Sequence, residues 1–253
     1  MLAANVDVAF LVAGIDRPPN VRRIERYLAL AWGGGATPVV LLNKADESSD
    51  VAGAEASVRI AAPGVEVLPV SALTGAGLDR LGPHLGPART LVFLGPSGVG
   101  KSTLVNALLG RTRQATASVR ASDARGRHTT TRRELFALPG GALLVDTPGT
   151  RSLELLDSDE GIGQAFTDVE AVATSCRFAD CRHRTEPGCA VRVALEDGVL
   201  DERRWASYQK LRREAAHVAR ESDPRAREAE RRRWKVIHAA AARRMRAKYG
   251  DAM

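Results

Sequence analysis

The stretch GPSGVGKST occupies residues 95–103 and follows the apolar run TLVFL at 90–94. It satisfies the pattern G-x-x-x-x-G-K-[ST], and the segment after it has helical spacing and ends in a glycine. Glycines in such a loop let backbone N–H groups turn inward around phosphate oxygens, and the N-terminus of the next helix adds a favourable potential. The sequence therefore predicts a phosphate-binding loop between a strand and a helix.

Each position of this loop has an expected part in holding a nucleotide. Lys101 is expected to reach the β- and γ-phosphates and to serve catalysis there, and the Ser102 hydroxyl to bind Mg²⁺. The remaining contacts come from the rest of the loop: Gly95, Pro96, Ser97, Gly98, Val99, Gly100 and Thr103. A glycine-rich turn without a ligand is the alternative, and the strand, lysine, serine and helix together argue against it. The loop alone does not distinguish ATP from GTP.

Strand-sized apolar runs alternate with helical spacing along the first 150 residues. A helix is expected whose apolar face carries Val21, Ile24, Leu28 and Ala31. The expected strands, which read as buried and parallel, are 6–13, 38–42, 65–70, 90–94 and 141–145. The alternation predicts an α/β fold with a mostly parallel sheet. The strand pattern stops after about residue 150, so we expect two domains, residues 1–160 and 161–253, the second mainly helical.

The stretch NKAD at 43–46 indicates which base is bound. A carboxylate accepts hydrogen bonds from N1–H and the 2-amino group of guanine, whereas adenine has an acceptor at N1 and no 2-amino group. A site built for such bonds rejects the wrong ligand by roughly 10⁴ or more. We therefore expect Asp46 to set guanine specificity, Asn43 to brace the base loop and Lys44 to pack over the ring, with Ala45 between them. Because NKAD ends a predicted strand, it lies where open α/β sheets bind ligands.

Two further strand ends agree with a nucleotide site. Ser71 and Ala72 follow a predicted strand, where a backbone amide meets the guanine carbonyl. In the stretch DTPG, Asp146 is expected to orient a Mg²⁺-bound water and Gly149 to sense the γ-phosphate. Together with the phosphate loop and NKAD, these segments predict a GTPase.

The polar loop GRHTTTR at 126–132 lies between the phosphate loop and DTPG. Its central threonine, Thr130, is the preferred ligand to complete the Mg²⁺ shell, and its two threonine neighbours are the alternatives. Ras-like enzymes carry a glutamine after DxxG that orients the attacking water. This sequence has Thr150 there, so hydrolysis without a partner should be slow. His128 either positions the water or packs against the loop, and the sequence leaves both possibilities open.

All three cysteines of the sequence fall within CRFADCRHRTEPGC at 176–189. The pattern C-x₄-C-x-H-x₅-C predicts a closed tetrahedral set for one structural Zn²⁺ ion, with no open position for catalysis. Its ligands are Cys176, Cys181, His183 and Cys189. Three unrelated buried thiols are the alternative, and their clustering argues against it. An odd cysteine count without a secretory leader also argues against a disulfide framework.

The order of these motifs is unusual, because small GTPases run phosphate loop, switch loop, DxxG, NKxD and SAx. Here NKxD and SAx come first. The sequence resembles the ribosome small-subunit-dependent GTPase A (RsgA/YjeQ) family of circularly permuted GTPases, over essentially its whole length. The matching stretches are AANVD at 3–7, NKAD, SALTGAGL, GPSGVGKSTL, GRHTTT, DTPG and the cysteine cluster, whose spacing the family shares. The resemblance implies hydrolysis of GTP to GDP and phosphate during late maturation of the small ribosomal subunit, stimulated by that subunit.

The resemblance also implies an OB-fold domain before AANVD, and this sequence begins almost on that motif. We therefore expect this chain to lack that domain, which would bind single-stranded nucleic acid. Residues 201–253 hold 16 Lys or Arg against 8 Asp or Glu, within a net charge of +7 for the whole chain. This basic segment is expected to contact rRNA. Trp234 either stacks on a base or packs on an apolar helical face.

The composition, 44% hydrophobic and 26% charged, is that of a globular protein. No apolar run reaches the length of a membrane span and no basic leader is present, so we expect a cytoplasmic protein without membrane contact, most simply a monomer. A guanylate-kinase-like nucleotide kinase is one alternative, and NKAD, SAL and the cysteine cluster argue against it. A GTP-responsive RNA-binding switch with negligible turnover is a second alternative, which the sequence leaves open.

Overall fold

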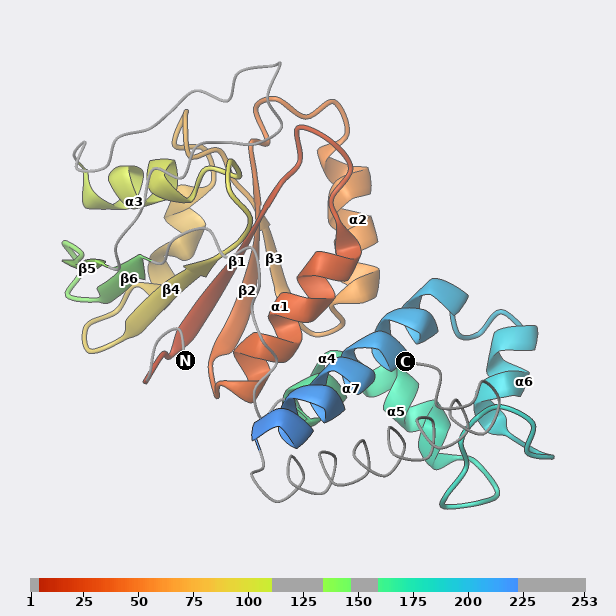
Figure 1. Ribbon diagram of the computed structural model, residues 1–253. Coiled ribbons are helices and arrows are strands. Elements are labelled where there is room, and N and C mark those ends of the chain that lie inside the picture. Colours follow the sequence, from red (N-terminus) through yellow and green to blue (C-terminus); the bar gives the residue numbers. More distant parts are fainter. Residues whose placement is uncertain (1–4, 111–133, 147–158, 223–253) are drawn as a thin grey trace, which may run out of the picture.

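The computed structural model describes residues 5–110, 134–146 and 159–222 (Figure 1). These residues contain a six-stranded sheet with the order β3-β2-β1-β4-β6-β5. The strands are β1 (Val8–Gly14), β2 (Thr37–Asn43), β3 (Glu66–Pro69), β4 (Thr90–Leu94), β5 (Glu134–Ala137) and β6 (Leu143–Asp146). All neighbouring strands pair in parallel except β5 and β6. The predicted α/β fold with a mostly parallel sheet is confirmed.

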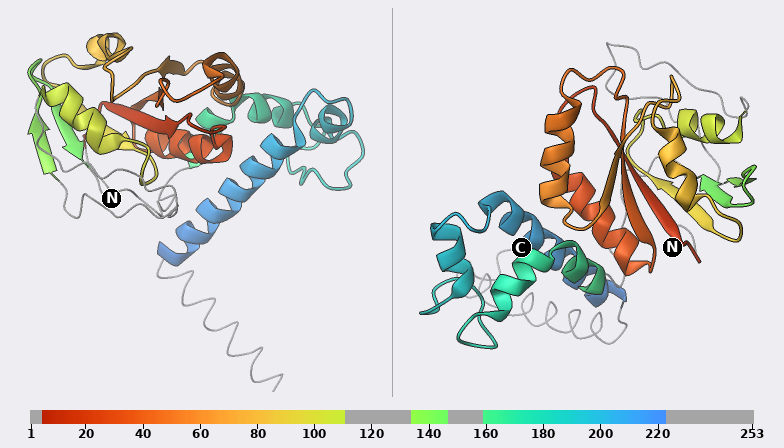
Figure 2. Two further views of the ribbon diagram at one scale, coloured as in Figure 1. Left: turned by 90° about the horizontal axis from the view of Figure 1, so that it is seen from above. Right: turned by 180° about the vertical axis from the view of Figure 1, so that it is seen from behind.

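The apolar runs form strands because helices cover both faces of the sheet, so successive side chains are buried in either direction. The helix α1 (Val21–Gly33) and the helix α2 (Val51–Ala61) cover one face (Figures 1 and 2). The helix α3 (Lys101–Leu109) and the 3₁₀ helix η1 (Leu78–His84) cover the other. Of the predicted apolar face of α1, Ile24, Leu28 and Ala31 are buried and Val21, in the first turn, is half-buried.

Strand β5 was not among the predicted strands. It is the antiparallel edge strand beside β6, and it is only four residues long. Leu135, Phe136 and Ala137 are apolar, but this run is short and only Phe136 is buried. At the edge of the sheet, covered on one face only, so short a run cannot be told from a turn or a helix segment by its pattern alone.

Four helices follow the sheet and gather beside α1, on the side of that helix away from the sheet (Figures 1 and 2). They are α4 (Asp159–Ala165), α5 (Thr167–Thr174), α6 (Ala190–Glu196) and α7 (Glu202–Ser222). Helix α4 lies against α1 so closely that a Cβ on Gly161 would overlap the carbonyl oxygen of Ala29. The division near residue 160 stays a prediction. None of the helices within the described ranges is long and apolar enough to cross a membrane.

Candidate nucleotide and metal sites

Four predicted motifs meet at one edge of the sheet, because parallel strands end on the same side. Strand β2 ends in Asn43 and leads into NKAD, β3 leads into Ser71, β4 leads into the phosphate loop, and β6 ends at Asp146. From β1 the chain adds β2 and then β3 on one side of that strand, whereas β4, β6 and β5 lie on its other side. The strand order therefore reverses between β1 and β4. The crevice at such a reversal, outside the carboxyl ends of the strands, is where open α/β sheets bind ligands.

The phosphate loop joins β4 to the N-terminus of α3. Gly100 has a φ of 95°, in the left-handed region, and a Cβ there would overlap the side-chain amide of Asn43. Lys101 begins α3 and is buried, and its Nζ lies 2.8 Å from the carbonyl oxygens of both Gly95 and Pro96. The ammonium group therefore lies inside the loop, beside the positive end of the helix dipole.

Asn43 connects the base loop to the phosphate loop. Its side chain is buried, and its Nδ2 donates a hydrogen bond of 2.7 Å to the carbonyl oxygen of Val99. Its Oδ1 accepts a hydrogen bond of 2.9 Å from the N–H of Ala72. One amide at the end of β2 thus holds the loops that follow β3 and β4. This geometry supports the bracing role predicted for Asn43.

The other base-loop residues lie at the rim of the same edge. Lys44 has a φ of 67°, and its Nζ lies 3.3 Å from Oδ2 of Asp16, a residue just beyond β1. The N–H of Ala45 donates to the carbonyl oxygen of Val70 at 3.1 Å, which fixes the loop to the end of β3. Asp46 is exposed. Sequence reasoning missed Asp16, because only the pairing of β1 with β2 brings it to Lys44.

A cleft of 470 Å³ lies between the phosphate loop and the N-terminal half of α1. This volume is typical of small-molecule sites. One wall is Pro96 to Val99, and the opposite wall includes Asn20, Arg23, Ile24 and Tyr27 of α1 and its cap. The cleft reaches Lys44 but not Asp46 or Ala72. Nor does it reach Lys101 or Ser102, so it borders the first half of the phosphate loop and not the residues expected to hold the β- and γ-phosphates and Mg²⁺.

Three predicted site residues, His128, Thr130 and Gly149, lie outside the described residues. Asp146 ends β6, at the predicted edge of the sheet. Ser102 and Thr103 stand half-buried in the first turn of α3, next to Lys101. The predicted roles of these residues in binding magnesium and water stay predictions.

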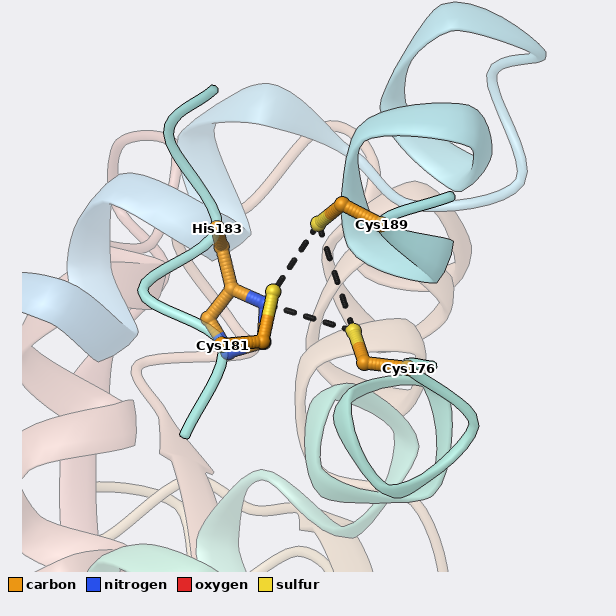
Figure 3. Close-up of side chains that lie close together, drawn as sticks. All are labelled: Cys176, Cys181, His183 and Cys189. Carbon is orange, nitrogen blue, oxygen red and sulfur yellow. Dashed lines mark hydrogen bonds between the residues drawn. The ribbon is translucent and has the colours of Figure 1, made fainter. Parts of the chain in front are cut away.

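The three cysteines and His183 converge on one point (Figure 3). Their four ligand atoms all lie within 4.8 Å of one another. The Nδ1 of His183 is 3.5 Å from the Sγ of both Cys176 and Cys189, and these two Sγ atoms are 4.0 Å apart. Bonds of about 2.0–2.3 Å around a tetrahedral zinc ion place ligand atoms roughly 3.5–3.8 Å apart. The spacing therefore fits a single metal ion.

Backbone N–H groups and neighbouring thiols shift the pKa values of two of the cysteines in opposite directions. Burial raises the pKa of Cys176, but the N–H groups of Val191 and Ala190, at the start of α6, bring it below its ordinary value of 9.0. Loss of solvation and the two neighbouring thiols raise the pKa of Cys181 to about 11. A metal ion bound here has to displace the proton of Cys181, so its affinity should fall with decreasing pH.

Glu186 organises the turn between the predicted metal ligands. Its carboxylate accepts hydrogen bonds from the N–H groups of Arg182, Arg184 and Thr185 at 2.8 to 3.0 Å. These backbone hydrogen bonds lower the pKa of Glu186 to about 2. They hold the chain on either side of His183, which has a φ of 56° in the left-handed region. The sequence shows an acidic residue within a tight turn, but it does not show that the backbone N–H groups point toward the Glu186 carboxylate, so the role of Glu186 was not predicted.

A family model, RsgA GTPase, matches residues 1–156. This chain belongs to the RsgA GTPase family. Among its relatives, the small ribosomal subunit biogenesis GTPase RsgA of Opitutus terrae is 55% identical over 239 residues, which cover 94% of this chain and 65% of the relative. RsgA of Methanosarcina acetivorans is 48% identical over 223 residues, which cover 88% of this chain and 60% of the relative. The chain thus spans less than two thirds of the length of both relatives.

Two solved structures of similar proteins share the fold. YjeQ from Thermotoga maritima matches with a TM-score of 0.60 and 27% identity, over 84% of this chain and 72% of that chain. YloQ, a circularly permuted GTPase, matches with a TM-score of 0.59 and 30% identity, over 84% of this chain and 69% of that chain. The predicted resemblance to the RsgA family and the predicted circularly permuted GTPase fold are confirmed.

Proposed function

We propose that this protein binds GTP, hydrolyses it to GDP and phosphate, and does so on the small ribosomal subunit. The bridge made by Asn43 carries the proposal, because it brings a phosphate-binding loop and a guanine-type base loop into one site. The relatives at 48–55% identity are named small ribosomal subunit biogenesis GTPases, which supports the same activity and the same partner.

In this proposal the nucleotide lies along the carboxyl edge of the sheet. The guanine ring fits between the loops after β2 and β3, with Asp46 accepting from N1–H and the 2-amino group, and the amide of Ala72 facing the carbonyl. Lys101 exchanges its two carbonyl partners for phosphate oxygens, which its position inside the loop makes a short movement. Ser102 and Thr130 supply protein ligands for Mg²⁺, while Asp146 and Gly149 face the bound water and the γ-phosphate.

Basal hydrolysis is slow in this proposal, because threonine at position 150 is too short to orient the attacking water as a glutamine does. The small subunit accelerates the reaction through His128, which positions the water when the subunit is bound. His128→Ala is expected to reduce stimulated hydrolysis while leaving GDP affinity unchanged. Unchanged stimulated hydrolysis would assign His128 to packing instead.

The Cys/His cluster is proposed to hold one structural Zn²⁺ ion. Soft thiolates with one imidazole in a tetrahedral set suit zinc, and four protein ligands leave no position for a substrate. Helix α7, on the same side of the molecule, exposes Arg203, Lys210, Arg213 and Arg220. This charge supports rRNA contact by the C-terminal part, in a protein proposed to work as a cytoplasmic monomer.

The test is GTP hydrolysis by the full chain, with and without purified small ribosomal subunits. We expect slow basal turnover, on the order of 10⁻⁴ to 10⁻² s⁻¹, and a rise of at least about tenfold with subunits. Asp46→Ala should abolish both rates through lost nucleotide binding, whereas its exposed neighbour, in the variant Glu47→Ala, should retain both. Tight GDP binding without stimulation would favour a GTP-responsive switch, and absence of guanine-nucleotide binding would contradict the proposal altogether.

A further inference from the structure

The helices after the sheet share one hydrophobic core with the nucleotide-binding part. The core runs from Leu28 of α1 through Phe166 to Leu211 of α7, and it includes the metal-ligating Cys189. Cys176, Cys181 and Trp205 pack against it as partly buried members. The metal cluster therefore borders the same core that supports one face of the sheet.

Arg204 of α7 joins five helices with its guanidinium group. Its Nε and Nη2 donate to the two carboxylate oxygens of Asp168 at 2.6 Å, at the start of α5. Its Nη1 donates to Oε1 of Glu25 on α1 at 3.1 Å and to the carbonyl oxygen of Ala61, the last residue of α2, at 3.0 Å. Its Nη2 also donates to the carbonyl oxygen of Ala165, the last residue of α4, at 3.0 Å. All five N–H groups of the guanidinium thus have acceptors.

This arrangement depends on arginine at position 204. Its side chain is 6% exposed and that of its partner Glu25 is 0% exposed, so neither charge is hydrated. Glu25 also accepts hydrogen bonds from Arg22 at 2.7 Å and from Ser207 at 2.5 Å. Removal of Arg204 would leave the buried Glu25 carboxylate paired with the partly exposed Arg22 but without its buried cation, which is destabilising. A lysine offers three donors from one point and cannot reproduce the planar fork.

Aromatic rings connect the metal cluster to Arg204. The ring of His183, a predicted zinc ligand, lies edge-on against Trp205 with centroids 5.4 Å apart. Trp205 stacks on Tyr208 at 5.5 Å, and Tyr208 packs against Phe166 at 5.6 Å. The Arg204 guanidinium lies over the Phe166 ring, 4.6 Å from its centroid. The position of His183 therefore influences the segment of α7 that carries Arg204.

The helix α1 connects Arg204 to the nucleotide site. Glu25 lies on the side of α1 that faces α7. Its neighbours Arg23, Ile24 and Tyr27 line the cleft whose other wall is the phosphate loop. One helix of 13 residues thus contacts both the Arg204 network and that cleft.

We propose that zinc and guanine nucleotide stabilise each other's binding, with Arg204 as the positioning residue between their sites. The inference rests on the proposed function, because it takes both ligands from there. Zinc fixes His183 against α7, Arg204 fixes α1 against α7, and α1 lines the cleft beside the phosphate loop. A ligand that orders these contacts lowers the entropy cost of ordering them when the second ligand binds. By linkage, each ligand raises the affinity for the other by the same factor.

The test is GDP affinity of the full chain, measured by calorimetry in excess Mg²⁺, before and after removal of zinc with a zinc-selective chelator. We expect zinc-free protein to bind GDP at least about fivefold more weakly, and readdition of one equivalent of Zn²⁺ to restore the affinity. GDP should tighten Zn²⁺ binding by the same factor. Equal GDP affinities with and without zinc would overturn the coupling. Absence of GDP binding in the zinc-loaded protein would instead contradict the proposed function.

Arg204→Lys tests the positioning residue. It is expected to retain one zinc per chain and to bind GDP when zinc is present. The coupling factor, which is the ratio of the GDP dissociation constants without and with zinc, should fall toward one. Arg213→Lys, on the exposed face of the same helix, is the matched control and should keep the full factor. Should Arg204→Lys fail to fold by circular dichroism, Ser207→Ala removes one hydrogen bond to Glu25 and should lower the factor in part. Wild-type coupling in the folded Arg204→Lys protein, or in Ser207→Ala when it serves instead, would overturn the role of Arg204.

Discussion

Asn43 shows how one side chain joins two separate loops at one edge of the sheet. We expect Asn43→Ala to raise the dissociation constant of GDP by roughly 10- to 100-fold, because the loops that carry Ala72 and Val99 are no longer held together and GDP binding has to order them. Its melting temperature without nucleotide should also fall, since the Ala72 and Val99 partners are lost in the free protein. Asp46→Ala is the contrast: its side chain is exposed, so GDP binding should disappear while the melting temperature stays unchanged. GDP binding by Asn43→Ala at wild-type affinity would contradict the bracing role.

Glu186 holds the turn of the predicted metal site through three backbone hydrogen bonds. Glu186→Ala should therefore lose zinc to a competing chelator faster than wild type, and Glu186→Gln should lie between them, because an amide oxygen is a weaker acceptor than a carboxylate. Zinc release can be followed with a metal-sensitive dye. Glu196→Ala, at the far end of α6, serves as the control. Identical release from Glu186→Ala and wild type would show that the metal alone shapes this turn.

Asp168 should make stability depend on pH. Burial alone would raise its pKa, but hydrogen bonds from Arg204 and the positive charge of Arg204 hold the pKa below its ordinary 3.8. A carboxyl group with a depressed folded pKa stabilises the fold above its unfolded pKa, and this contribution is lost as the pH falls through the folded value. Asp168→Asn should therefore destabilise the protein at neutral pH, with a smaller difference from wild type below pH 3.8. Urea unfolding at neutral pH and below pH 3.8 measures the free energy of unfolding of both proteins. A difference between wild type and Asp168→Asn that is the same at both pH values would contradict this explanation.

At the scale of elements, the strands and helices with a strong local sequence pattern are the ones that the sequence predicts. The apolar runs of β1, β2 and β4 and the spacing of α1 were readable because both faces of the sheet are covered. Edge strand β5 was not, because only one of its residues is buried. The predicted nucleotide and metal motifs could be found from the sequence because each is a short pattern of neighbouring residues. The bonds of Arg204 were not, because they join residues 36 to 179 positions apart, which no local period records.

The contact between α1 and α4 provides a test at this scale. Gly161→Ala should destabilise the protein by roughly 1–3 kcal/mol or more, because its Cβ would overlap the backbone at Ala29 and Gly33 and force the helices apart. Gly163→Ala, in the same helix, is the control: the nearest atom to its Cβ is Oε1 of Glu170 at 4.0 Å. That substitution should be neutral or stabilising by about 0.5–1 kcal/mol. Thermal unfolding decides, and equal effects of the two substitutions would contradict the close packing.

At the scale of the whole molecule, the permuted order has a structural consequence. The base loop and the phosphate loop come from distant parts of the sequence, yet both follow strands beside β1. Beyond β6 the chain continues into α4, which packs on α1, the helix that also borders the phosphate loop. The edge of the sheet that carries the predicted nucleotide motifs and the helices beside the Cys/His cluster are therefore joined twice, through the chain and through the shared core.

The most direct test of this account is a calorimetric titration of the full chain with GDP and with ADP in the presence of Mg²⁺. We predict that GDP binds and that ADP binds at least about 10⁴-fold more weakly, because the Asp46 carboxylate meets two donors on guanine and a lone pair on adenine. Equal affinity for the two nucleotides would contradict the assignment of NKAD as the base loop. Absence of binding by either would contradict the assembled site itself.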